Sequence, residues 1–209
     1  MGTTQEAFMT DPLNAQMARE DLQYIRQTLQ AAGQFTAVPG KSLMLAGVMA
    51  LAGVACNLLL TGAPWSRGAS PVLALDSWGL VLGISVAIVC YGIYRKSQQL
   101  GTPLRAPLAR KLLWSLSPSL FVGGILTNLA VRSGNLEWLP CIWLGCYGAA
   151  VINGGQVSVA PVRYMGLCFV ATAAAAAATP PDLGLAWLGV GFGWLHLVCG
   201  GYIAWRHNG

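Results

Sequence analysis

Six polar side chains that could bind a ligand or take part in a reaction lie inside long apolar stretches of this chain. They are Asn57, Ser85, Asn128, Asn153, Gln156 and His196. Polar groups are costly to place in a bilayer, so each one inside a membrane-spanning segment is a candidate site. The amides can hydrogen-bond to a ligand or to another helix, and the imidazole can also carry a proton near neutral pH.

His196 is the only histidine within an apolar run, and it precedes Trp205 by nine residues, which is about 13 Å along a helix. One interpretation is a catalytic or proton-relay group. The other, which we favour, is a neutral histidine hydrogen-bonded to a neighbouring helix, because no carboxylate accompanies it within the runs. Haem ligation or a histidine-rich metal site would need a second histidine at that depth, so we expect no cofactor and no metal.

Two further pairs of amides are candidate polar sites within the membrane. Asn153 and Gln156 flank two glycines in "VINGGQ", where they could hold a ligand or clamp two helices together, and we favour the clamp. Asn57 and Asn128 occupy matching places in "GVACNLLLTG" and "GILTNLAVRSG". If that weak echo marks a repeat, the two amides would line a polar cavity that opens outward.

The composition places these residues in a bilayer. Of the 209 residues, 55% are hydrophobic and only 9% are charged, whereas about a quarter of a soluble domain is charged. Six apolar runs are long enough to span: Ser42–Thr61, Trp78–Tyr94, Leu112–Val131, Trp138–Val159, Val162–Ala178 and Leu183–Trp205. We therefore predict an all-α polytopic membrane protein, with residues 1–41 as a cytosolic or interfacial part and residues 42–209 as a six-helix transmembrane domain.

The basic residues predict the orientation of the bundle. With six spans, ten of the 12 Lys and Arg residues fall on one side and only Arg67 and Arg132 on the other. The positive-inside rule then places both termini in the cytoplasm. Because these charges lie between apolar runs, the net charge of +5 indicates topology and not nucleic-acid binding. The six cysteines all fall in apolar runs, where we expect free thiols.

The N-terminal segment has the pattern of an amphipathic helix. Asp11 and Pro12 favour a start there, and Gly33 favours an end. An apolar stripe that includes Leu22, Ile25 and Leu29 follows the helical spacing. One interpretation is a helix that lies on the membrane or on the protein's own loops. The other is a helix whose Leu22, Ile25 and Leu29 face contacts a partner protein or a second copy of the chain.

The segment "QFTAVPGK", Gln34 to Lys41, joins this helix to the first span. We interpret it as an elbow that sets the angle between them. Phe35 and Val38 would dip into the headgroup boundary. Pro39 would restrict Val38 to extended conformations, and Gly40 would free the turn into the span.

The stretch "DLQYIRQTLQAAGQFTAVPGK", Asp21 to Lys41, resembles a set of uncharacterised bacterial integral-membrane proteins. These begin with a short cytosolic helix reading like "YIR", followed by an "FTAVPG"-like junction and a row of spans. The resemblance implies a bacterial inner-membrane location and no catalytic activity.

Three classes of function remain open. We favour a non-enzymatic membrane protein with a sensing, scaffolding or regulatory role, whose partners are the lipid bilayer and either a homo-oligomer or a membrane or cytosolic protein. The alternative is a small-molecule binding or transport component. An intramembrane enzyme is least favoured, because Ser85 and His196 lack the glycine spacing and oxyanion site of an intramembrane serine protease.

Overall fold

The computed structural model describes residues 16–17, 19–25, 38–61, 65, 71–99 and 107–206 of the chain. The chain divides into two units, Met1–Gln34 and Phe35–Gly209, which are considered separately. In the first unit, residues 16–17 and 19–25 are helical. Leu22 and Ile25 are both exposed there, and Leu29, the third residue of the expected contact face, lies outside the described residues.

The second unit is a bundle of helices. Its elements, in chain order, are α2 (Gly40–Thr61), α3 (Pro71–Gln99), α4 (Pro107–Arg132), the 3₁₀ turn η1 (Leu136–Trp138), α5 (Leu139–Gly155), α6 (Ala160–Ala178), the 3₁₀ turn η2 (Pro181–Leu183), α7 (Gly184–Leu188), the π-helical segment η3 (Gly189–Leu195) and α8 (His196–Arg206). All regular structure in the described parts of the chain is helical, so the expected all-α class is confirmed.

Five of the described segments are long and apolar enough to cross a membrane: Gly40–Leu60, Leu75–Gln99, Arg110–Arg132, Ala160–Ala178 and Pro181–Arg206. They agree with five of the six expected runs. The exception is Trp138–Val159, in which helix α5 covers only 17 residues. It stops at Gly155 because the chain turns there, with Gln156 N–H donating to the Asn153 carbonyl and Val157 N–H to that of Gly154, each at 3.2 Å.

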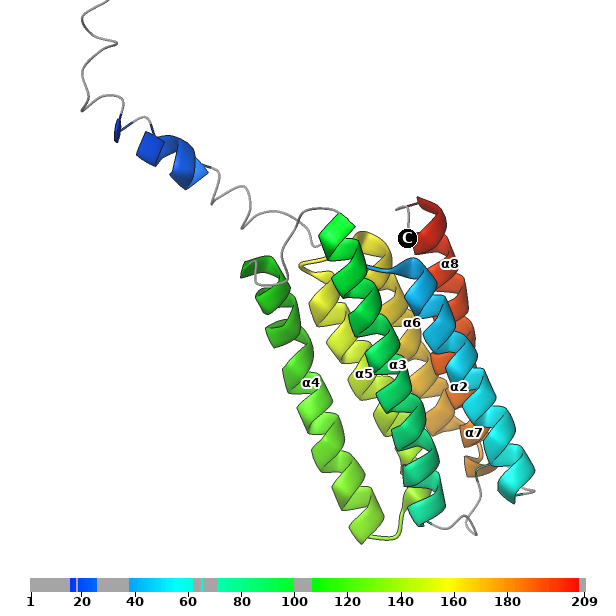
Figure 1. Ribbon diagram of the computed structural model, residues 1–209. Coiled ribbons are helices and arrows are strands. Elements are labelled where there is room, and N and C mark those ends of the chain that lie inside the picture. Colours follow the sequence, from blue (N-terminus) through cyan, green and yellow to red (C-terminus); the bar gives the residue numbers. More distant parts are fainter. Residues whose placement is uncertain are drawn as a thin grey trace, which may run out of the picture. The chain divides into compact units, whose positions relative to one another are not determined.

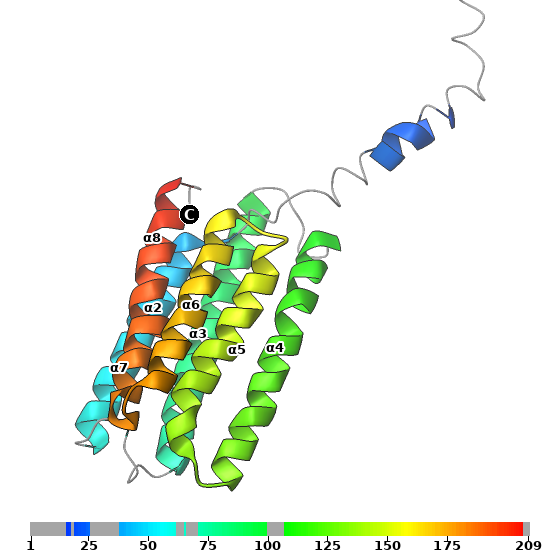
Figure 2. The same cartoon turned by 180° about the vertical axis from the view of Figure 1, so that it is seen from behind.

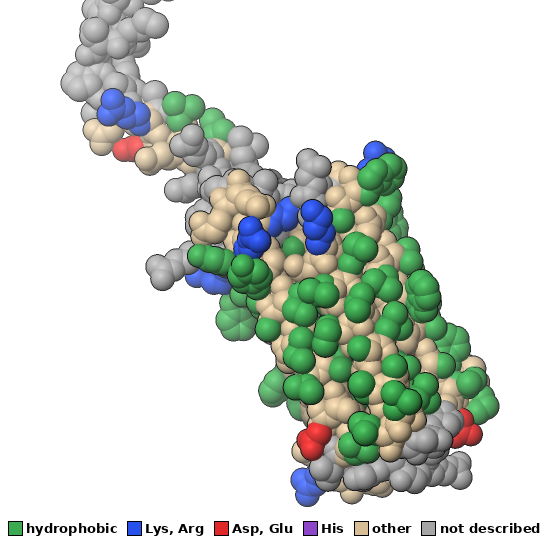
Figure 3. Space-filling model, turned by 45° about the vertical axis from the view of Figure 1, so that its right-hand side comes forward, with side chains coloured by type: hydrophobic (Ala, Val, Ile, Leu, Met, Phe, Trp, Pro, Cys, Tyr) green, Lys and Arg blue, Asp and Glu red, His purple; other side chains and the backbone are tan. Residues whose placement is uncertain are grey.

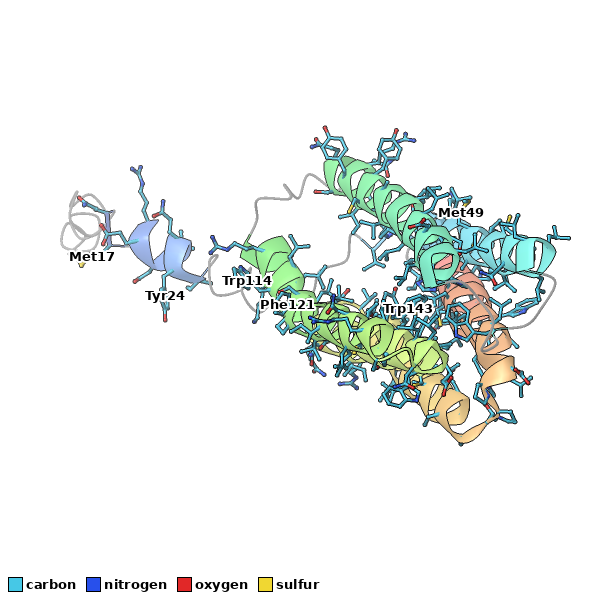
Figure 4. The ribbon with its side chains drawn as sticks, turned by 90° about the horizontal axis from the view of Figure 1, so that it is seen from below. Met17, Tyr24, Met49, Trp114, Phe121 and Trp143 are labelled. Atoms are coloured by element: carbon cyan, nitrogen blue, oxygen red, sulfur yellow. The ribbon has the colours of Figure 1, made fainter. Side chains whose placement is uncertain are left out.

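The helices pack side by side in an order that does not close into a ring. Figures 1 and 2 show α5 between α4 and α6, and α2 beside α3 and α8. The last segment, from α7 through η3 to α8, packs against both α2 and α6 and joins the two groups. Helices α3 and α4 therefore stand at the two ends of the order, and Figure 4 shows them on separate arms when the bundle is viewed from below.

Glycines set the closest helix contacts. A Cβ at Gly200 of α8 would lie 2.8 Å from the carbonyl oxygen of Gly40, and one at Gly148 of α5 would lie 2.9 Å from the Cβ of Phe169 in α6. Small residues let membrane helices approach to backbone contact. The role of Gly40 thus differs from the one expected: it is the first residue of α2 and is buried against Ala204 and Gly200 of α8, so its small size matters there.

Among the described glycines, Gly134 has a positive φ, +75°, and it lies just after the end of α4. The turn is closed by Ser133 N–H donating to Leu129 at 2.9 Å and Asn135 N–H donating to Ala130 at the same distance. Left-handed glycines commonly end helices in this way, because they turn the chain and satisfy the last carbonyls.

The charges lie at the ends of the bundle and the apolar side chains along its length. On the face seen in Figure 3, hydrophobic side chains cover the middle, Lys and Arg gather at one end, and the other end carries Asp and Glu with a basic side chain beside them. The helix order places Lys41, Arg95, Arg110, Arg163 and Arg206 at the same end. An apolar belt with a basic end is the surface expected of a membrane bundle.

Candidate functional site

A hydrogen bond between a tyrosine and a histidine lies in the interior of the bundle. His196 is the first residue of α8 and is only 5% exposed. Its Nε2 lies 2.8 Å from the hydroxyl oxygen of Tyr147, which comes from the middle of α5. The pair joins two helices that are far apart in the sequence, at the level of the bundle core.

Aromatic rings enclose this pair. Tyr147, Phe169, Phe192 and His196 form one cluster, in which the centroid distances run from 4.8 Å for Tyr147–Phe169 to 6.2 Å for Phe192–His196. The Tyr147–Phe169 and Tyr147–Phe192 pairs meet edge to face, an arrangement favoured by the ring quadrupoles. Three helical segments, α5, α6 and η3, therefore supply the surroundings of the imidazole.

The cluster continues toward the end of the bundle that carries the α2–α3 connection. Phe192 packs against Trp78 at 6.4 Å, Trp78 against Trp143 at 6.1 Å, and Trp143 against Trp65 at 5.9 Å. Trp143 also donates a 2.9 Å hydrogen bond to the hydroxyl of Thr127 in α4. This row of rings connects α3 with α5, and Figure 4 shows Trp143 between the arms that carry α3 and α4.

The second ring nitrogen of His196 has an unusual environment. Nδ1 is buried and has no hydrogen-bond partner with good geometry among the described residues. The backbone carbonyls of Gly191 and Phe192 nevertheless approach the ring. They belong to the π-helical segment, whose wider turns leave carbonyls without their usual α-helical donors. Because carbonyls only accept, this environment favours the tautomer with the proton on Nδ1 and Tyr147 donating to Nε2.

This geometry fits one of the two interpretations of His196 better than the other. A neutral imidazole hydrogen-bonded to a neighbouring helix needs one polar partner and burial, and His196 has both. A catalytic or proton-relay group needs access to water or substrate, and the rings of Tyr147, Phe169 and Phe192 surround the imidazole instead. The arrangement can hold α5 and α8 together.

The other candidate polar residues lie apart from this pair, and only Asn153 and Gln156 share one place, the turn after α5. Asn57 is 4% exposed and donates to the hydroxyl of Ser77 in α3 at 3.4 Å. Asn128 is exposed on α4, and Asn153 and Gln156 are exposed where α5 turns into α6. Asn57 and Asn128 therefore do not line a common cavity.

Two contacts of buried polar side chains had no counterpart in the sequence analysis. One is Tyr147, a tyrosine deep inside an apolar run; a hydroxyl far from both membrane interfaces is a sequence signal for a buried hydrogen bond. The other is Lys96, which was counted only as a topology signal. Lys96 is 8% exposed and donates a 2.9 Å hydrogen bond to the carbonyl oxygen of Val38.

The Lys96 contact fixes the elbow at the entrance to α2. Val38 is half-buried and Pro39 is buried. A Cβ at Gly92, one turn before Lys96, would meet the side chains of Ser42 and Pro39. Val38 was expected to reach the headgroup boundary, but its carbonyl is held by α3 instead. Of the elbow residues that the structure describes, Val38, Pro39 and Gly40 thus pack against the bundle, whereas Lys41 is exposed.

No protein-family model, curated protein or solved structure matches this chain. The resemblance of residues 21–41 to uncharacterised bacterial membrane proteins therefore remains a prediction. The six cysteines are free, as expected, and the described residues include no group of three or more His, Cys, Asp or Glu side chains arranged to hold a metal ion.

Proposed function

We propose that this chain is a six-span protein of the bacterial inner membrane with a sensing, scaffolding or regulatory role, in which the N-terminal segment contacts a partner. The observation that carries the proposal is the hydrogen bond from Lys96 to Val38. It anchors the place where the N-terminal segment enters the bundle to a helix end that carries basic residues.

Burying the Lys96 ammonium costs free energy, and this cost favours a functional role for the contact. A lysine that is 8% exposed has lost most of its hydration, and a buried ammonium is tolerated only when hydrogen-bonded. Here its donor is directed to the backbone of the residue before Pro39. A change of position at Val38 would reach α3 through this contact, and Trp78 of α3 packs against Trp143 in the aromatic row.

The sixth span in this proposal is η1 together with α5. The 17 residues of α5 cover about 26 Å and the three of η1 add about 6 Å, which together approach the roughly 30 Å of a bilayer core. Helix α5 also lies between α4 and α6, both of spanning length. Six spans with the basic end inside place both termini in the cytoplasm.

Topology and partner contact are tested separately. Reporter fusions that are active only outside the inner membrane, placed after Gln99 and after Arg132, should be inactive and active respectively.

For the partner, the full-length protein is purified from membranes in parallel with a Leu22→Gln/Ile25→Gln variant and a Gln23→Ala control. Both changed apolar side chains are exposed, so the variant should fold and lose its co-purifying protein, while the control keeps it. Recovery of the same proteins from all three samples would rule out docking through this face.

The two other classes of function have less support. A small-molecule binding or transport component built on Asn57 and Asn128 would need the two amides to share a cavity. Asn57, however, lies on α2 and faces α3, whereas Asn128 lies on the exposed side of α4. An intramembrane enzyme built on His196 would need water to reach the imidazole, which is 5% exposed.

A further inference from the structure

Helix α4 contacts the bundle along one narrow face. A Cβ at Gly154 of α5 would touch the side chains of Leu112 and Leu116, and one at Gly123 would touch Cys146. Further along, Thr127 accepts the hydrogen bond from Trp143. These α4 positions are spaced 4, 7 and 4 residues apart, so they share one side of the helix. Among the long helices that the structure describes, α4 packs closely against α5.

A different kind of face lies roughly a third of a turn around α4 from this contact face. Ser117, Phe121, Gly124 and Asn128 are spaced 4, 3 and 4 residues apart and form a second stripe, which we call the outer stripe. All four are exposed, and Phe121, labelled in Figure 4, is 73% exposed. A Cβ added at Gly124 would meet nothing within 4 Å.

Asn128 distinguishes the outer stripe from an ordinary lipid-facing surface. It lies four residues before Arg132, so it sits about 6 Å inside that end of the helix. Its carboxamide makes no hydrogen bond to any residue that the structure describes. Polar side chains within membrane helices almost always face protein, because an unpaired amide is costly in hydrocarbon.

We infer that the outer stripe of α4 is the contact surface for a second copy of this chain. Two copies inserted in one membrane have the same orientation, so a two-fold axis along the membrane normal pairs each α4 residue with its own counterpart at the same depth. A carboxamide carries both a donor and an acceptor, so Asn128 is complementary to Asn128. Gly124, one turn away, allows the two backbones to approach closely.

The chemistry of the stripe selects a second copy over a lipid. An acyl chain offers no partner to the Asn128 amide, whereas an identical helix offers a matched donor and acceptor. Arg132 of each copy lies one turn beyond Asn128, near the polar end of the helix, where its long side chain can extend into the headgroups. This inference is independent of the role proposed for the N-terminal segment, because it rests on residues of α4 alone.

The test is energy transfer between donor- and acceptor-labelled full-length protein in liposomes, measured over a range of lipid-to-protein ratios. The unchanged protein should dimerise, and Asn128→Leu should weaken the dimer by about fivefold to thirtyfold, as expected for interhelical hydrogen bonds worth roughly 1–2 kcal/mol in total. Gly124→Leu should weaken it as well by holding the helices apart. Asn128→Gln keeps the amide and should retain most of the association.

Two matched controls separate the stripe from general effects. Gly79→Leu adds the same bulk to an exposed glycine of α3 with nothing within 4 Å, and Leu129→Ala changes an exposed neighbour of Asn128 on another side of α4. Neither should alter the dimer. Because the changed residues are all exposed, each monomer should unfold at the same temperature in detergent. Energy transfer no greater than that of unrelated membrane proteins, or an Asn128→Leu dimer as tight as the original, would overturn the inference.

Discussion

Tyr147 and His196, which are 49 residues apart in the sequence, share a 2.8 Å hydrogen bond inside a cluster of aromatic rings. The bond links the middle of α5 to the first residue of α8. The carbonyls near Nδ1 come from the chain segment just before His196. The bond to Tyr147 is therefore the contact by which another helix provides a hydrogen-bond partner for this buried imidazole.

The first prediction concerns this hydrogen bond. Tyr147→Phe should lower the free energy of unfolding by about 1–3 kcal/mol, because it leaves a buried Nε2 without a partner. Changing both residues, in Tyr147→Phe/His196→Phe, should cost less than the sum of the single changes, with a coupling of roughly 0.6–1.7 kcal/mol. Unfolding by SDS titration in mixed micelles measures all three variants. Tyr91→Phe, at an exposed tyrosine of α3, is the control and should be neutral. Strict additivity would show that the bond contributes nothing.

The second prediction concerns the elbow. Lys96→Met keeps much of the length of the side chain but removes the donor to Val38, so the start of α2 should open more often. Loss of a charge-assisted hydrogen bond worth about 1.5–3 kcal/mol should speed hydrogen exchange of the amides near Leu43 by about tenfold or more. Mass spectrometry of the elbow peptide measures this rate.

Lys111→Met is the matched control for the elbow, because Lys111 is an exposed lysine at the same end of the bundle. It should leave the exchange rates of the elbow peptide unchanged. If Lys96→Met behaved like this control, the Val38 contact would not hold the elbow.

The third prediction contrasts two glycines. Gly200→Ala places a Cβ 2.8 Å from both the Gly40 carbonyl oxygen and the Met44 nitrogen, and should destabilise the bundle by about 1–3 kcal/mol through overpacking. Gly83→Ala adds a methyl group where nothing lies within 4 Å. It should be neutral or stabilising by up to about 1 kcal/mol, because alanine favours the helix. Thermal unfolding in detergent compares the two, and equal effects would contradict the close approach of α2 and α8.

The fourth prediction contrasts two tryptophans of the aromatic row. Trp143 Nε1 donates to Thr127 at 2.9 Å, whereas Trp78 Nε1 is buried with no hydrogen-bond partner among the described residues. Both changes to Phe remove the same volume. Trp143→Phe should therefore cost about 0.5–1.5 kcal/mol more than Trp78→Phe, because only it breaks a hydrogen bond. Unfolding by SDS titration measures both costs, and an equal or larger cost for Trp78→Phe would contradict the prediction.

The amino-acid sequence alone determines that this chain forms a membrane bundle and roughly where its helices lie. Apolar runs of spanning length, interrupted by Lys and Arg, leave few alternatives, because a bilayer excludes charge and requires every backbone group to be paired within its own helix. Five of the six expected spans are helices of spanning length. The early end of α5 was not predicted, because Gly154 and Gly155 could equally have continued an apolar helix.

What only the tertiary structure decided is which faces of these helices meet. Spans that are apolar on all sides carry no stripe to indicate the buried face, so their rotation is settled by close packing around glycines. That rotation brings Tyr147 to His196 and Lys96 to Val38. It also buries Asn57 while leaving Asn128, its expected counterpart, on the far side of α4. Hydropathy gives the depth of a residue, and helix packing gives its neighbours.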